Sequence, residues 1–129
     1  MSNKLKRTHT ASAPEAIGPY SQAVEANGFL FTSGQIPLDP GSMNLVGTDI
    51  HTQAHQVFKN LKAVLAASSC TFSDVIKATV FLQSMNDFPK LNEVYAEYLG
   101  EYKPARSTVE VAKLPKGSLV EIELIAKLP

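Results

Sequence analysis

The sequence predicts a single α+β domain, in which a mainly antiparallel sheet carries two helices on one face. The chain has 129 residues, enough for one domain spanning residues 1–129 and too few for two ordinary ones. Two segments have apolar residues at helical spacing, whereas the other apolar segments are short, rich in β-branched residues and bounded by turn residues. Two helices cannot cover both faces of such a sheet, so we expect the other face to support self-association, with clefts between subunits.

The first third of the chain predicts three strands and one ordered loop. An Asn-Gly pair between the second and third strands supplies the two positive-φ residues of a type I′ hairpin turn, and two prolines and a glycine mark the loop. Tyr20 then lies just before the second strand, and Ser33 and Gly34 end the third. The strands are expected at residues 4–9, 23–26 and 29–33, and the loop at residues 13–20.

Helical spacing of apolar residues predicts two helices. The first begins after Thr48 or Asp49, either of which can cap its N-terminus. The second is expected to begin near residues 86–87, with Pro89 in its first turn, and to end at Gly100 as its C-cap. The apolar stripe of the first helix consists of Ile50, Ala54, Val57, Phe58, Leu61, Val64 and Leu65.

Three further strands are expected at residues 75–82, about 105–111 and about 118–126. The first of them is apolar almost throughout, which predicts burial on both faces. The last two are joined by a turn-rich segment, so they are expected to pair with each other as antiparallel neighbours. Thr108 would then lie near Glu121, and the side chains of Arg106 and Glu121 would converge.

Arg106 and Glu121 are charged residues within strand-like runs that otherwise suit a core. Because an unpaired buried charge is costly, each of them must find a partner. They can form a structural ion pair with each other, or Arg106 can offer bidentate hydrogen bonds to the carboxylate of a small ligand. The two residues by themselves leave both alternatives open.

Charge and cysteine content exclude several classes of protein. Basic and acidic residues number 12 each, so no net field favours nucleic acid or an anionic membrane as a partner. Cys70 is the only cysteine, which rules out an intramolecular disulfide and indicates a reducing compartment. The sequence has no apolar stretch of signal-peptide or membrane-spanning type, so we expect a cytoplasmic protein.

Other candidate residues give weaker indications. His51 and His55 lie one helical turn apart, but no glutamate follows His51 as in zinc proteases and no third ligand is obvious, so no metal is expected. Ser33 suits a hydrogen-bond donor better than a nucleophile. Asn92 lies at the margin of the second helix's apolar face, either as an inward polar anchor or as a surface residue. The glycines form no nucleotide-binding fingerprint, so no cofactor is expected.

Several short motifs, taken in order and spacing, carry a resemblance to a known family. They are Gly18-Pro19-Tyr20-Ser21-Gln22-Ala23, Thr32-Ser33-Gly34-Gln35-Ile36-Pro37, Val80-Phe81-Leu82, Asn86-Asp87-Phe88, Pro104-Ala105-Arg106-Ser107 and the segment from Val109 to Glu123. Together they resemble the RidA family, also called the YjgF/YER057c/UK114 family, over nearly the whole chain. The resemblance implies a chorismate-mutase-like α+β fold assembled as a homotrimer with three clefts between subunits.

The same resemblance implies a cofactor-free enamine/imine deaminase. Its substrates would be reactive 2-imino acids such as 2-iminopropanoate and 2-iminobutanoate, which it hydrolyses to 2-oxo acids and ammonia. By the resemblance, Arg106 holds the substrate carboxylate and Glu121 positions the attacking water. The cleft is lined by Tyr20, Ser33 and Asn92 and by backbone groups of Gly34 and Thr108. In the empty site we expect Arg106 to lower the pKa of Glu121.

Two departures from the family pattern bear on specificity. Many deaminase members have a longer loop before the Pro-Ala-Arg-Ser motif, whereas residues 101–103 make a short polar approach here, and many have cysteine where Thr108 stands. The alternative function is a non-catalytic protein that binds small metabolites. Translation inhibition with ribonuclease activity, or a chaperone-like role, has also been described in the family, although zero net charge argues against RNA as the main ligand.

Overall fold

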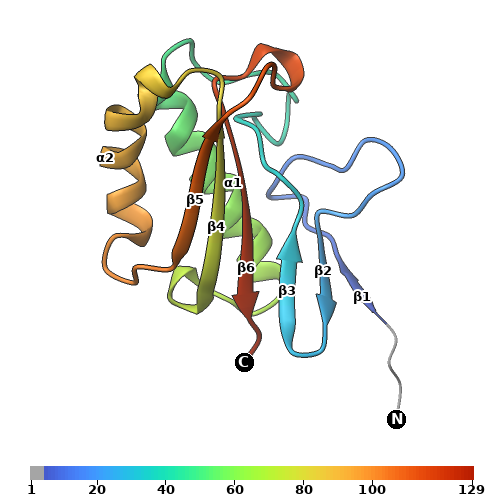
Figure 1. Cartoon of the computed structure of the whole chain (residues 1–129). Coiled ribbons are helices and arrows are strands. Elements are labelled where there is room, and N and C mark those ends of the chain that lie inside the picture. The colour runs from blue at the N-terminus through green and yellow to red at the C-terminus, as the bar shows by residue number, and fades with distance from the viewer. Residues whose placement is uncertain (1–4) are drawn as a thin grey trace.

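A six-stranded sheet with two helices packed on one face forms the fold of residues 5–129, the part of the chain that the computed structural model describes (Figure 1). The strands are β1 (Lys6–Thr8), β2 (Ala23–Ala26), β3 (Phe29–Thr32), β4 (Val75–Leu82), β5 (Ala105–Glu110) and β6 (Val120–Lys127). The helices are α1 (Ile50–Ala67) and α2 (Phe88–Leu99), with short 3-10 turns at Phe72–Asp74, Met85–Asp87 and Pro115–Gly117. The predicted α+β class with both helices on one face is confirmed. Lys4, at the start of the predicted first strand, lies outside the described residues.

Local turn and capping chemistry largely follows the predictions. Asn27 and Gly28 have φ values of 52° and 84°, so the β2–β3 hairpin has the expected turn with positive φ. Asp49 caps α1, its carboxylate accepting a hydrogen bond of 3.0 Å from the backbone N–H of Thr52. Gly100 is the C-cap of α2, but its φ is −60°, so the left-handed conformation typical of a glycine cap is absent there.

The strand order β1-β2-β3-β6-β4-β5 corrects the predicted pairing of the last two strands. β4 lies between β5 and β6, pairing parallel with β5 and antiparallel with β6. The helix α2 returns the chain to the starting end of β4, so β5 runs parallel to β4 and becomes an edge strand. β6 pairs with the other edge of β4. It therefore lies between β3 and β4 and has a neighbouring strand along both of its edges.

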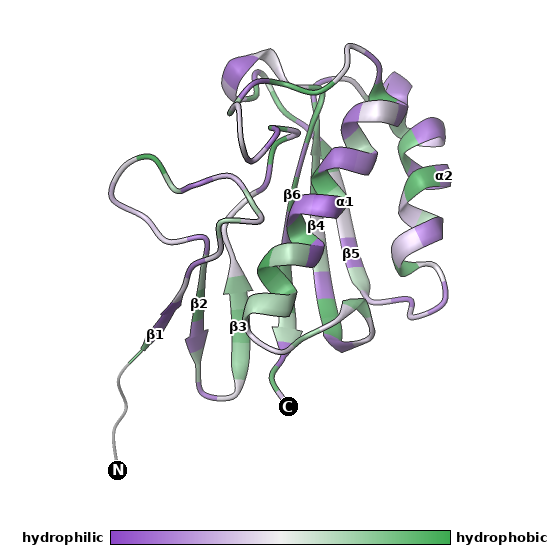
Figure 2. Ribbon diagram, turned by 180° about the vertical axis from the view of Figure 1, so that it is seen from behind, coloured by the Kyte–Doolittle hydropathy of each residue, from purple (hydrophilic) through white to green (hydrophobic). Residues whose placement is uncertain are grey.

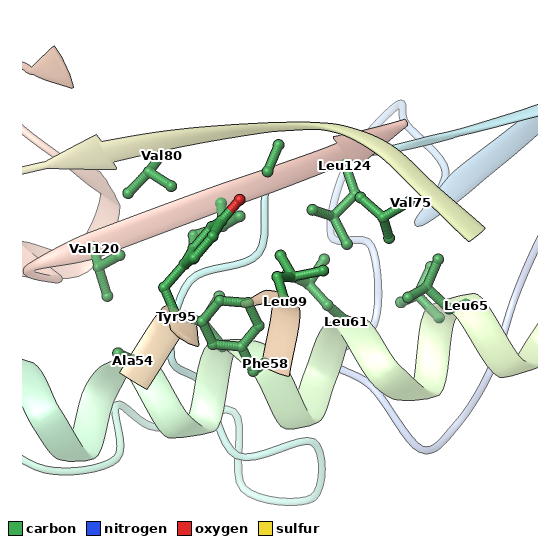
Figure 3. Close-up of a cluster of buried hydrophobic side chains, with 14 of the residues drawn as sticks. Ala54, Phe58, Leu61, Leu65, Val75, Val80, Tyr95, Leu99, Val120 and Leu124 are labelled. Atoms are coloured by element: carbon green, nitrogen blue, oxygen red, sulfur yellow. The ribbon is translucent and has the colours of Figure 1, made fainter. Parts of the chain in front are cut away.

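The core lies between the sheet and the helices (Figure 3). Phe58, Leu61 and Leu65 project from α1 toward the strands, where they meet side chains such as Val80 and Leu124. Along β6, the even-numbered residues from Val120 to Ala126 are buried. The odd-numbered residues of β6 therefore face away from the helices, because successive side chains of a strand point to opposite faces.

The two helices are amphipathic. Figure 2 shows hydrophobic and hydrophilic bands alternating along α1 and α2.

The face of the sheet that points away from the helices is only partly covered by the chain itself. β4 alternates buried and partly exposed residues, so the predicted burial on both faces is wrong for the single chain. On the far face Phe31 and Val109 are each 44% exposed. No helix among residues 5–129 combines the length and hydropathy needed to cross a membrane.

Candidate active site

Glu121 lies on β6 and points away from the helices, since its neighbours Val120 and Ile122 are fully buried on the helix side. The segment after β3 runs beside it, where the N–H of Gln35 donates a 2.8 Å hydrogen bond to the carbonyl of Ile122. This places Gly34 directly against the Glu121 side chain. A Cβ at Gly34 would lie 2.8 Å from Cδ and 3.0 Å from Cγ of Glu121. Only glycine lets the carboxylate approach the backbone this closely.

Burial raises the pKa of the Glu121 carboxyl, and the neighbouring negative charge of Glu123 adds to the increase. Arg106 does not contribute to this shift. The expected lowering of the Glu121 pKa by Arg106 is therefore wrong for the single chain. A carboxyl group with a raised pKa accepts a proton more readily when it is ionised, which suits a general base.

A cleft of about 520 Å³ opens over Glu121. Its walls include Tyr20, Ser33, Gly34 and Glu121, and we call it the Glu121 cleft. The Ser33 hydroxyl donates a 2.6 Å hydrogen bond to the carbonyl of Ser21, which fixes its side chain at the end of β3. Tyr20 is 54% exposed at the rim, and its hydroxyl accepts a 3.3 Å hydrogen bond from the N–H of Ile17. Four of the residues predicted for the site thus lie together.

Gln22 holds the loop that forms one wall of the Glu121 cleft, a role that the sequence analysis missed. Its side chain is 2% exposed and donates to the carbonyls of Thr10 at 3.0 Å and Pro14 at 2.8 Å. Its carbonyl oxygen accepts a 2.7 Å hydrogen bond from the N–H of Thr10. A glutamine beside a predicted strand gives no local signal of burial. Its place within the first family motif was the only available indication.

Arg106 lies on β5 and faces α2. Its backbone is opposite the buried Ala78 of β4, and its guanidinium carbon is 4.6 Å from the ring centroid of Tyr95 and 5.3 Å from that of Phe88. One guanidinium nitrogen donates a 2.7 Å hydrogen bond to the side-chain oxygen of Asn92. Among residues 5–129 it forms no salt bridge. The aromatic rings and the amide hold the cation in place and leave its charge uncompensated.

The Arg106 guanidinium borders a groove of about 410 Å³ between α2 and the edge of the sheet. We call it the Arg106 groove; its walls include Asn92, Tyr95, Lys103 and Arg106. Asn92 is exposed and also contacts Arg106, so it is a surface residue that orients a charged side chain.

Thr108 lies two residues beyond Arg106 on the same edge strand. Its hydroxyl is buried and, within the described part of the chain, has no hydrogen-bond partner. The N–H of Val111 donates to the carbonyl of Leu82 on β4 at 2.9 Å. Because these groups alternate in direction along a strand, the N–H and carbonyl of Thr108 point to the free edge of β5. Its backbone is therefore available to a ligand or a second chain.

The Glu121 cleft and the Arg106 groove do not meet within one chain. Arg106 shares the helix face with Ala78, whereas Glu121 is opposite Phe81 on the other face, and β4 separates the two strands. The predicted convergence of Arg106 and Glu121 is therefore wrong for the single chain, and so is a direct ion pair between them. The error follows from the assumed pairing of β5 with β6, which would have placed both side chains on adjacent strands.

Comparison with known proteins shows the family of the chain. A sequence profile described as endoribonuclease L-PSP matches residues 10–128. The chain belongs to this family, which is the RidA (YjgF) family. The resemblance found in the sequence motifs is thereby confirmed.

Individual relatives of this RidA family chain match over most of their length. A RutC family protein of Pyrococcus horikoshii is 58% identical over 117 residues, which cover 91% of this chain and 93% of that protein. A Homo sapiens protein named 2-iminobutanoate/2-iminopropanoate deaminase is 46% identical over 127 residues, covering 98% of this chain and 93% of that protein. The crystal structure of E. coli TdcF with bound serine has a TM-score of 0.90 at 42% identity, covering 96% of this chain and 99% of that one.

Proposed function

We propose that this chain is an imine deaminase that hydrolyses 2-imino acids such as 2-iminopropanoate and 2-iminobutanoate to 2-oxo acids and ammonia. The observation that carries the proposal is a matched pair of groups. Arg106 is a positioned cation without an acidic partner among the described residues, and Glu121 is a half-buried carboxylate with a raised pKa. The first suits a substrate carboxylate and the second suits activation of a water. The name of the human relative supports this choice.

The proposed site is completed by a second copy of the chain. Within one chain Arg106 and Glu121 lie on opposite faces of the sheet, so one substrate can contact both only if they come from different copies. The far face carries exposed apolar side chains, including Phe31 and Val109, which supports association through this face. We propose a homotrimer, in which the Glu121 cleft of one copy faces the Arg106 groove of the next. A closed ring of three copies would contain three such sites.

The proposed chemistry needs no cofactor, because the C=N carbon of an imine is already electrophilic. Arg106 binds the substrate carboxylate and the free backbone edge at Thr108 supplies further hydrogen bonds. Glu121 takes a proton from water while the water oxygen bonds to the imine carbon, and it passes that proton to the nitrogen to give the carbinolamine. The carbinolamine hydroxyl then gives its proton to Glu121, which delivers it to the amino nitrogen as the C–N bond breaks, ammonia leaves and the C=O bond forms. Glu121 thus ends as the carboxylate it was at the start, and orientation provides much of the acceleration.

Trapping of the imine tests the proposed activity directly. Threonine dehydratase generates 2-iminobutanoate in the assay, and semicarbazide captures the imine that survives. We expect the protein to reduce the trapped fraction in a concentration-dependent way, and Arg106→Ala and Glu121→Ala each to reduce that effect to a small residual level that is measurable only at high protein concentration. Unchanged trapping in the presence of the folded protein would overturn the deaminase proposal. Activity retained by Arg106→Ala would overturn the assigned role of Arg106 and leave the activity itself standing.

Mixing the two inactive variants tests whether the site is shared. If Arg106 and Glu121 act from different copies, a random equimolar assembly of Arg106→Ala and Glu121→Ala chains restores about a quarter of wild-type activity, because each site needs one intact contribution from each of two chains. The chains are refolded together so that they exchange. If both residues act from one chain, the mixture stays inactive. Refolded wild-type chain gives the reference activity.

Binding without hydrolysis is a second candidate, favoured by the crystal structure of the relative TdcF, which contains bound serine. In that case the same cleft would hold a small amino or oxo acid and release it unchanged. Calorimetric titration with 2-oxobutanoate separates the two steps. Deaminase function predicts that Glu121→Ala still binds the oxo acid but no longer removes imine, whereas Arg106→Ala loses binding. A protein that binds the oxo acid and shows no effect in the imine assay would favour the second candidate.

A further inference from the structure

The outer surface of the helix pair gathers three side chains that commonly bind metals. His51 and His55 lie four residues apart on α1, with ring centroids 4.8 Å apart, and Glu97 reaches them from α2. One potential ligand atom from each of the three lies within 4.8 Å of the other two. The sequence showed the histidine pair without a third ligand. Packing of α2 against α1 supplies that ligand, and this changes the chemical interpretation of the pair.

We propose that His51, His55 and Glu97 form a binding site for a divalent transition-metal ion such as Zn²⁺. Two imidazoles and one carboxylate are ligands that zinc accepts, at bond lengths of about 2.0–2.2 Å. Tetrahedral coordination at these lengths separates neighbouring ligand atoms by about 3.4 Å. The Nε2 atom of His55 and a carboxylate oxygen of Glu97 are already 3.4 Å apart.

The remaining distances between the three ligand atoms can be closed by rotation of exposed side chains. His51 and Glu97 are exposed, so rotation about their side-chain bonds can close separations of up to 4.8 Å without moving either helix. His55 is the fixed member of the group. A simple ion pair between His55 and Glu97 would explain that contact but gives no role to His51, whose ring lies edge-on to that of His55 at an interplanar angle of 67°.

Tyr98 orients His55 for this role. Its hydroxyl is 2.8 Å from Nδ1 of His55, so a proton on Nδ1 can be donated to Tyr98 while Nε2 keeps its lone pair for the metal. Tyr98 is itself held by stacking on the buried ring of Phe58, at a centroid distance of 4.6 Å and an angle of 10°. A metal-binding histidine usually has such a partner on its other nitrogen, which fixes the direction of the ring.

The proposed ion would fasten α1 to α2 and would not contact the substrate, because none of its three ligands lines the Glu121 cleft or the Arg106 groove. A ligand that binds only the folded chain raises the temperature of unfolding in proportion to the logarithm of its concentration. The site therefore predicts metal-dependent stability. This consequence can be measured whether or not the chain is a deaminase.

Calorimetric titration of the full chain, prepared without a polyhistidine tag, tests the site. We expect one Zn²⁺, Ni²⁺ or Cu²⁺ per chain, no comparable binding of Mg²⁺, and a thermal midpoint that rises with zinc concentration. His51→Ala and Glu97→Gln should each weaken binding by at least about tenfold, since loss of a supporting partner alone already costs that much. Both residues are exposed, so neither substitution should disturb the fold.

Two substitutions provide matched controls. His9→Ala removes the third histidine of the chain, and Glu93→Gln removes an exposed carboxylate one turn before Glu97 on α2. Both should bind zinc as the wild-type chain does. The proposal is overturned if zinc does not bind saturably. It is also overturned if binding survives either His51→Ala or Glu97→Gln, or if a control substitution weakens binding equally.

Discussion

Replacing Gly34 by alanine is expected to disable Glu121 while leaving the fold intact. The new methyl group would lie 2.8 Å from Cδ and 3.0 Å from Cγ of Glu121. Gly34 is not among the glycines with positive φ, so its backbone conformation can accept an L-residue. The segment that carries it is tied to β6 through Gln35 and Ile122, whereas Glu121 forms no salt bridge among residues 5–129. The carboxylate should therefore move, and the backbone should stay.

The size of the movement follows from ordinary contact distances. Carbon atoms meet comfortably from about 3.4 Å, so Cδ of Glu121 must retreat by at least about 0.6 Å from its separation of 2.8 Å. The carboxylate oxygen nearest Gly34 must move further, by roughly 1 Å or more. Misplacement of a reacting group by about 1 Å costs on the order of 100-fold in rate. We therefore expect kcat/KM to fall about 100-fold, which is about 2.7 kcal/mol of transition-state stabilisation.

The imine-trapping assay measures this loss, and a double-mutant cycle assigns it to Glu121. We compare wild type, Gly34→Ala, Glu121→Ala and the double variant. If the methyl group acts by displacing the carboxylate, Gly34→Ala should have no further effect once Glu121 is alanine. Gly41→Ala is the matched control, since Gly41 also lacks a positive φ and its nearest contact, Asp39, lies outside the Glu121 cleft.

Two results would refute the reasoning. Gly34→Ala with at least half of wild-type activity would mean that the carboxylate tolerates the methyl group or does not act in catalysis. A loss of activity that persists undiminished on top of Glu121→Ala would mean that the substitution acts through something other than Glu121. Thermal unfolding followed by circular dichroism confirms that each compared variant is folded.

Three further predictions follow from the site. Asn92→Ala frees the Arg106 guanidinium and should raise KM about tenfold with kcat little changed, because the lost charged hydrogen bond orients substrate binding; steady-state kinetics measure it. Glu121 has a raised pKa in the folded chain, so its contribution to stability is present below the ordinary glutamate pKa and is lost as pH rises through the raised value. Glu121→Gln should therefore unfold at higher urea concentration than wild type at neutral pH but not at acidic pH, when both are compared as single chains at high dilution. Gln22→Ala leaves buried loop groups unpaired and should cost about 1–3 kcal/mol in urea unfolding.

Each of these predictions has a contrary outcome. An unchanged KM in Asn92→Ala would show that the amide is not needed to orient Arg106. A stability difference between Glu121→Gln and wild type that is the same at acidic and neutral pH would contradict the raised pKa. Gln22→Ala with wild-type stability would mean that water replaces the lost hydrogen bonds, and the loop would then not depend on this side chain.

Sequence patterns predicted the local elements well because their causes are local. The strand at residues 75–82 and the hairpin at the Asn-Gly turn have the bounds or conformations expected, and Asp49 caps α1 as its position before the apolar stripe indicated. Periodicity and capping depend on residues a few positions apart, so one sequence carries the whole signal. The partners of Gln22, up to 12 positions away, lie outside the reach of such patterns.

These local sequence patterns could not predict the order of the strands in the sheet. β5 and β6 follow each other in the chain and have a turn-rich connection, which favours a hairpin, but β4 lies between them. After α2, β5 runs parallel to β4, and β6 takes a central position in the sheet. Both features depend on which arrangement buries the apolar faces of the sheet and the helices, and no single segment of the sequence carries that information. The positions of Arg106 and Glu121 changed with this order, from two neighbouring strands to opposite faces of the sheet.

By itself, the sequence determined the fold class, the family and the residues worth testing, because motif identity and apolar spacing are properties of short segments. Only the tertiary structure decided where those residues point. It placed Arg106 and Glu121 on opposite faces of the sheet, set Gly34 against the Glu121 carboxylate, and brought Glu97 to His51 and His55. Such contacts arise when segments that are distant in the sequence bury their apolar faces against one another. This packing also fixes the positions of the charged residues on those segments.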